Sequence, residues 1–106
     1  MKVAPPKEWE PLETAVPRDV FRAEVEVWAQ RIKVQPRVVQ IRPMRHKWGS
    51  CSTAGIVTFD RDLLRQHTEF RRRVIVEELL HLRLPSHGKL FRSLLRAYLN
   101  APGATQ

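Results

Sequence analysis

Two carboxylates and an imidazole lie close together in the apolar segment Val76-Glu77-Glu78-Leu79-Leu80-His81. In a helix with about 100° per residue, Glu77 is offset from His81 by ~40° and Glu78 by ~60°, so the three side chains share one face. Burying these groups costs several kcal/mol unless a partner satisfies them. A metal ion or an arginine side chain would meet that need.

A second imidazole, His87, follows six positions after His81. Pro85 lies between them, ends the helix and allows the chain to turn back over the face that carries His81. Two imidazoles and one carboxylate form an accepted zinc-ligand set that leaves one coordination position open. The spacing therefore predicts a metal held by Glu77, His81 and His87. Glu78 is then free to act as the general base toward metal-activated water. The alternative is a buried network in which arginine neutralises the carboxylates.

The chain before this site contains one predicted helix and two predicted strands. After Pro17, apolar residues recur at three- and four-residue steps until Pro36, which predicts an amphipathic helix. Its apolar stripe consists of Phe21, Val25, Trp28 and Ile32. Two β-branched runs, residues 37–42 and 56–59, predict a two-strand unit.

Two further helices are predicted around the site. Helical spacing runs from about Thr68 to Leu84 and stops at Pro85. Ser86 is the predicted N-cap of a closing helix. The buried stripe of that helix contains Phe91, Leu94, Leu95 and Tyr98. These elements predict an α+β fold with a small β-sheet packed on about three helices. Residues 17–100 form the predicted single domain, between a loose arm (1–16) and a C-terminal tail (101–106).

Length and composition exclude several classes of protein. A chain of 106 residues with a single cysteine, Cys51, is too short for a two-domain enzyme and cannot form an internal disulfide. No apolar run reaches membrane-spanning length and the N-terminus does not resemble a secretory signal, so we expect a cytoplasmic protein without a membrane partner. The net charge of +8 falls within residues 35–106, which predicts an electropositive face and makes nucleic acid a candidate partner.

The residues around the predicted site resemble a known family. They are Arg42-Pro43-Met44-Arg45-His46-Lys47-Trp48-Gly49-Ser50-Cys51-Ser52, the strand at 56–59, residues 74–82 and His87-Gly88-Lys89-Leu90-Phe91. These stretches resemble the YgjP-like metal-dependent hydrolases, relatives of the SprT and WLM metalloproteases, over residues 37–99. The resemblance implies a zincin core, in which a His-Glu-x-x-His helix and a third histidine bind zinc.

The resemblance implies that His81 and His87 are metal ligands and that Glu78 is the base. Glu77 stands where the family motif has its first zinc-binding histidine. A glutamate has a similar reach, but its charge makes metal-bound water less acidic and favours harder ions. We therefore expect zinc first, with manganese or iron as alternatives, or no metal if the site is degenerate.

The predicted function is metallopeptidase-like hydrolysis of a peptide or protein substrate, which pairs in extended form with an exposed sheet edge. The region predicted for this contact contains Trp48, Gly49, Ser50, Cys51, Ile56 and Val57. The Cys51 thiol is expected to be a packing residue and not a nucleophile. The alternative function is a catalytically impaired binding module of the same fold, with nucleic acid bound through the basic later half.

Overall fold

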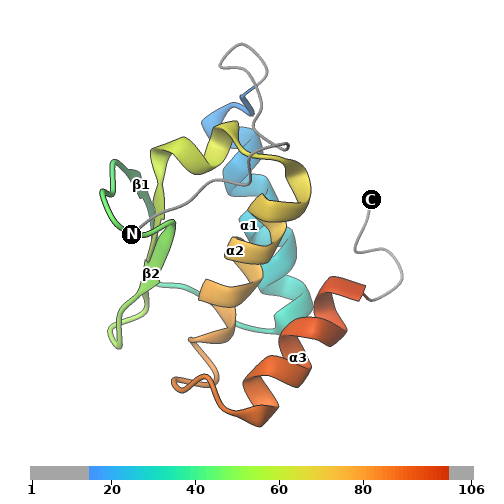
Figure 1. Cartoon of the computed structure of the whole chain (residues 1–106). Coiled ribbons are helices and arrows are strands. Elements are labelled where there is room, and N and C mark those ends of the chain that lie inside the picture. Colours follow the sequence, from blue (N-terminus) through green and yellow to red (C-terminus); the bar gives the residue numbers. More distant parts are fainter. Residues whose placement is uncertain (1–14, 101–106) are drawn as a thin grey trace.

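The computed structural model describes residues 15–100 of the chain. Its elements are α1 (Arg18–Ile32), β1 (Val38–Arg42), β2 (Gly49–Cys51), β3 (Ile56–Asp60), the 3-10 helix η3 (Arg61–Arg65), α2 (Thr68–Leu80) and α3 (Lys89–Asn100). Helices α1 and α2 lie beside the sheet, and α3 packs against α2 away from the strands (Figure 1). The expected α+β architecture, a small sheet on three helices, is confirmed. Apart from positions 15 and 16, the predicted arm and tail lie outside the described residues.

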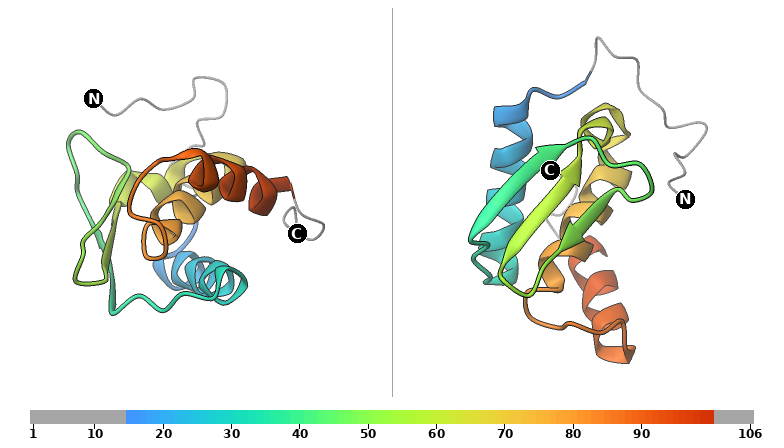
Figure 2. Two further views of the ribbon diagram at one scale, coloured as in Figure 1. Left: turned by 90° about the horizontal axis from the view of Figure 1, so that it is seen from below. Right: turned by 90° about the vertical axis from the view of Figure 1, so that its left-hand side faces the viewer.

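The sheet has three strands in the order β1-β3-β2 (Figure 2, right). β3 is central, runs parallel to β1 and pairs antiparallel with β2. The sequence predicted β1 and β3 but not β2, because Gly49-Ser50-Cys51 shows no β-branched residues and no hydrophobic alternation. This short strand is defined by its pairing with β3 and not by its own propensity.

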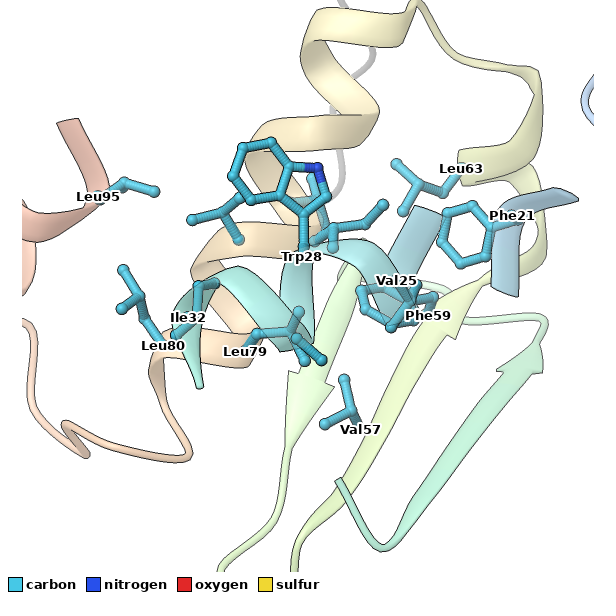
Figure 3. Packing of buried hydrophobic residues seen from close by; sticks show 14 of the residues in the cluster. Phe21, Val25, Trp28, Ile32, Val57, Phe59, Leu63, Leu79, Leu80 and Leu95 are labelled. Atoms are coloured by element: carbon cyan, nitrogen blue, oxygen red, sulfur yellow. The ribbon is translucent and has the colours of Figure 1, made fainter. Parts of the chain in front are cut away.

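The hydrophobic core lies between the sheet, α1 and α2 (Figure 3). All four residues of the predicted stripe of α1 are buried: Phe21, Val25, Trp28 and Ile32. From β3, Val57 and Phe59 point into the same core, and the ring of Phe59 meets that of Phe21 edge to face at 5.2 Å. Because α2 is anchored in this core, the residues at its C-terminal end have a fixed position relative to the sheet.

Both helices around the site differ from the prediction at one end. α2 ends at Leu80 instead of continuing to Leu84, because the N–H groups of Leu82 and Arg83 bond to carbonyls three residues back. α3 begins at Lys89, and the carbonyl of Gly88 accepts the first helical bond from Arg92 N–H. The prediction that Ser86 caps this helix is therefore wrong.

An ion pair between a buried arginine and a partly exposed glutamate connects α2 to α1. Arg71 is only 4 % exposed, and its Nε and Nη2 atoms donate to the two carboxylate oxygens of Glu24 at 3.0 and 2.8 Å. Within residues 15–100, no arginine forms a salt bridge with Glu77 or Glu78. The network in which arginine neutralises those two carboxylates is therefore not the arrangement observed. No helix in this part of the chain is long and apolar enough to cross a membrane.

Candidate active site

The structure brings His81 and His87 into contact. His81 is the C-cap residue of α2, and the chain returns through Pro85 so that the two rings stack with their centroids 4.5 Å apart. Their Nε2 atoms are 2.7 Å apart, which is hydrogen-bonding distance between two imidazole nitrogens. The pair therefore presents its two Nε2 atoms at one point.

Phe91 of α3 supports this pair, a role that the sequence analysis missed. Its ring stacks on His87 at 4.4 Å and lies 4.8 Å from the ring of His81, while its own side chain is only 2 % exposed. Arg92 adds a hydrogen bond from Nη1 to the carbonyl of His87 at 3.0 Å. The first turn of α3 thus orients the exposed His87 loop. His87 precedes α3, so no helical spacing in the sequence indicates this contact.

Glu78 lies beneath β2 in a setting that changes its acidity. Burial raises its pKa from the ordinary value of 4.5 to about 7, with a further upward contribution from the negative charge of Glu77 and an opposing one from Lys47. A carboxyl group that titrates close to neutral pH can both accept and return a proton. This is the property required of a general base.

Gly49 allows the close approach between β2 and Glu78. A Cβ atom at this position would lie 2.8 Å from Cγ of Glu78, closer than two carbon atoms can pack. Gly49 is the first residue of strand β2. Its lack of a side chain determines how near the carboxylate lies to the sheet.

The predicted ligand set is only partly assembled. Within residues 15–100, no group of three or more histidine, cysteine, aspartate or glutamate side chains is arranged to hold a metal, so Glu77 does not complete the His81–His87 pair. Two nitrogens bound tetrahedrally to one zinc ion are separated by ~3.3 Å. Imidazole nitrogens are suitable metal ligands, but these two Nε2 atoms would have to separate by ~0.6 Å.

The predicted substrate region divides between an edge strand and the central strand. Within residues 15–100, β2 pairs with β3 alone. Asp60 N–H donates to the carbonyl of Trp48, and Ser52 N–H donates to the carbonyl of Ile56, so the backbone groups of Trp48 and Ser52 face β3. Strand alternation therefore directs the backbone groups of Gly49 and Cys51 toward the open edge.

Ile56 and Val57 do not lie at an edge. They belong to β3, which is paired on both sides, and Val57 is fully buried. The expectation that they form part of an exposed sheet edge is wrong, because the unpredicted strand β2 covers β3 on that side. Trp48, the residue before β2, packs its ring edge to face on Phe70 of α2 at 5.2 Å.

Cys51 is half-buried beside the site. Burial, followed by the nearby charge of Glu78, raises the pKa of its thiol above the ordinary value. A thiol in this setting stays protonated at neutral pH and is a poor nucleophile. Its environment therefore agrees with the packing role expected from the sequence.

Comparisons with known proteins define first the class and then the family. The crystal structure of the metallopeptidase zymogen abylysin from Pyrococcus abyssi matches with a TM-score of 0.67 at 22 % identity, over 80 % of this chain and 85 % of that one. The zymogen jannalysin from Methanocaldococcus jannaschii matches with a TM-score of 0.67 at 20 % identity, over 83 % of each chain. The fold is that of zincin-like metallopeptidases.

The family model described as "YgjP-like, metallopeptidase domain" matches residues 7–104. The chain therefore belongs to the YgjP-like metallopeptidase family, as its resemblance indicated. No curated protein matches the sequence.

Replacing Gly49 by Ala tests the contact between β2 and Glu78. We expect the new Cβ to push the Glu78 side chain or β2 away, with a loss of about 1–3 kcal/mol in the free energy of unfolding. Denaturant unfolding measures this loss. Gly88→Ala is the matched control, because its Cβ would meet only Ser86 Oγ at 4.0 Å. Equal stability of the two variants would contradict the tight contact.

The raised pKa of Glu78 predicts a pH-dependent stability of the metal-free protein. The unfolded state releases this proton near 4.5 and the folded state near 7, so the stabilisation is complete below about pH 4.5 and is lost as the pH rises to about 7. Glu78→Gln should therefore be more stable than the wild type at pH 8 by about 1–2 kcal/mol, and the difference should disappear toward pH 4.5. Denaturant unfolding at both pH values measures it, with Glu26→Gln on the exposed face of α1 as control. A difference between Glu78→Gln and wild type that does not change with pH would refute the burial of this carboxyl.

Proposed function

We propose that this chain is a metal-dependent peptide hydrolase in which His81, His87 and Glu77 hold a divalent ion, zinc before manganese or iron, and Glu78 is the general base. The observation that carries the proposal is the convergence of the two Nε2 atoms at 2.7 Å, at the end of the helix that also positions Glu78. Family membership and fold add support, since both belong to metallopeptidases. A bound ion would supply Lewis-acid polarisation of the carbonyl group and make water more acidic.

Three other side chains have separate roles in the proposed reaction. Glu78, with a pKa of about 7, accepts a proton from the attacking water and returns it to the leaving amine. Phe91 holds the imidazole pair through ring contacts. Its side chain has no hydrogen-bonding group, so it does not compete for either Nε2 atom. Lys47 lies close enough to oppose the rise in the pKa of Glu78, and so keeps part of the population ionised.

The two edge strands of the sheet differ in a way that favours substrate pairing with β2 over β1. At β1, Arg22 Nη1 donates to the carbonyl of Val39 at 2.7 Å, and Arg18 Nη1 donates to that of Ile41 at 3.4 Å. These arginines occupy acceptors that an added strand would need. The outward backbone groups of β2, in contrast, adjoin Glu78 through Gly49. An extended peptide paired with β2 would place its backbone beside the general base.

The experiment that tests this proposal is elemental analysis of protein purified without added metal or a metal-binding tag. We expect about one equivalent of a transition ion, together with hydrolysis of labelled casein that stops on chelation and returns when the ion is restored. Protein that contains no ion, takes none up from zinc, manganese or iron salts, and does not cleave casein would overturn the proposal.

A second candidate is a binding module for nucleic acid, in which case the catalytic site is degenerate. One observation favours it: a cavity of about 360 Å³ between α2 and α3 is lined by Arg73, Arg92 and Arg96 and, among the residues that the structure describes, by no carboxylate. This function predicts oligonucleotide affinity that falls steeply with salt and needs no metal. The peptide hydrolase predicts neither property.

A further inference from the structure

A second cavity adjoins the candidate active site and has a distinct chemistry. Its volume is about 680 Å³, and three chain segments form its walls: residues 33–35 after α1, the β2–β3 turn at 51–55, and residues 81–85 at the end of α2. In Figure 2 (right) the β2–β3 turn lies at the same end of the molecule as the C-terminal ends of α1 and α2. His81 belongs to both this cavity and the site, and Cys51, which lies beside the site, also lines the cavity.

The walls of this cavity are cationic. Among residues 15–100, they include Lys33 and Arg83 but no aspartate or glutamate. Neither cation forms an ion pair with a carboxylate in the described part of the chain. Two unneutralised cations in a concave site attract an anion more strongly than the same charges on an open surface.

The backbone positions both cations. Arg83 Nη1 donates to the carbonyl of Ile32 at 3.1 Å, which holds the guanidinium at the end of α1 and leaves its remaining N–H groups available. Lys33 caps α1 in the left-handed conformation, with φ 65° and its N–H bonded to the carbonyl of Ala29. The turn opposite is also fixed, because Gly55 has φ 87° and Ser52 Oγ accepts from Ile56 N–H at 3.2 Å.

The cavity lies where a neighbouring residue of the substrate would fall. On β2, Gly49 contacts Glu78, whereas Cys51, two residues and about 7 Å farther along the strand, lines the cavity. A peptide paired with this edge and cut beside Glu78 would therefore place a residue one or two positions from the scissile bond at the cavity mouth. Apolar wall residues such as Val34 and Leu82 suit the methylene groups of a short side chain.

We propose that this cavity selects substrates that carry a carboxylate one or two residues from the scissile bond, supplied either by an acidic side chain or by the C-terminus of the peptide. This inference rests on the proposed peptide hydrolase and names the class of substrate. Charge-assisted hydrogen bonds from Lys33 and Arg83 provide the recognition.

Peptide binding to the metal-free Glu78→Gln variant tests this inference without requiring turnover. The probes are blocked alanine hexapeptides that carry one Glu or one Gln at each position in turn, and all-alanine peptides that end in a free acid or an amide. We expect at least one carboxylate peptide to bind about tenfold more tightly than its amide partner. Tighter binding in the Glu series would indicate recognition of a side-chain carboxylate, and tighter binding of the free-acid peptide would indicate recognition of a C-terminal carboxylate.

Matched variants locate the effect. Lys33→Gln and Arg83→Gln, each added to Glu78→Gln, should reduce the carboxylate preference severalfold, whereas Arg61→Gln removes an equal charge from the exposed start of η3 and should retain it. Lys33→Gln preserves the contact between Arg83 and Ile32, so it remains informative if Arg83→Gln is unstable.

Equal affinity for acid and amide peptides, or the same loss in Arg61→Gln, would overturn the inference even if the wild type hydrolyses casein. Carboxylate preference in a protein that binds no metal and cleaves nothing would instead overturn the proposed hydrolase and leave this cavity as a carboxylate-binding site.

Discussion

Replacing Glu78 by Gln is expected to lower kcat by about 10²–10⁴-fold while the protein retains its metal. The amide has nearly the same shape as the carboxylate, so it preserves the packing against Gly49 but cannot accept a proton from water. Burial and the charge of Glu77 raise the pKa of the natural side chain to about 7, where it exchanges protons readily at neutral pH. Initial rates on labelled casein, measured with metal content on the same preparation, provide the test.

The control for this experiment is Glu69→Gln, in the first turn of the same helix but far along the chain from the imidazole pair. It removes a carboxylate from α2 and should leave the rate within about twofold, as is usual for an exposed surface change. Unchanged turnover in Glu78→Gln would remove Glu78 from the mechanism. Loss of metal together with turnover would instead indicate that Glu78 is itself a ligand.

Replacing His81 by Ala is expected to abolish metal retention. His81 supplies one of the two converging Nε2 atoms and holds the stack with His87. Mutations of groups that merely orient a ligand cost 10–100-fold in metal affinity, so loss of a ligand should cost more. Competition with a chromogenic chelator measures the affinity, and elemental analysis measures what the purified protein retains.

The matched change at the third proposed ligand is Glu77→His, which introduces the histidine that the resemblance implies for this position. We expect zinc affinity to rise, because an imidazole suits zinc and removes the charge that acts on Glu78. His67→Ala is the control for the loss of an imidazole, since His67 accepts a bond from Glu69 N–H at the start of α2, at the opposite end of that helix. Full metal content in His81→Ala would exclude the proposed ligand set.

Local patterns were sufficient for the elements with strong periodicity. The stripe of Phe21, Val25, Trp28 and Ile32 predicted α1, and all four residues are buried as expected. The β-branched run at residues 37–42 predicted β1 in the same way. In such elements the residues that follow the helical or strand period are the ones that become buried, so the sequence alone is enough to predict the element.

Elements defined by long-range pairing could not be predicted in this way. β2 has neither β-branched residues nor alternation, and only its bonds to β3 define it. Because β2 was not predicted, β3 was expected to have a free edge, and Ile56 and Val57 were wrongly assigned to it. The early end of α2 at Leu80 is likewise set by the 3-10 turn at its C-terminus.

By itself, the sequence determined the residue types of the candidate site and the bend at Pro85 that returns His87 to His81, because helical spacing and proline geometry act over a few residues. Only the tertiary structure decided the position of Glu78 beneath Gly49, the aromatic support from Phe91, and the cationic cavity between Lys33 and Arg83. These features join segments that are far apart along the chain. Burial and electrostatic environment depend on the summed packing of all such segments, which no local pattern contains.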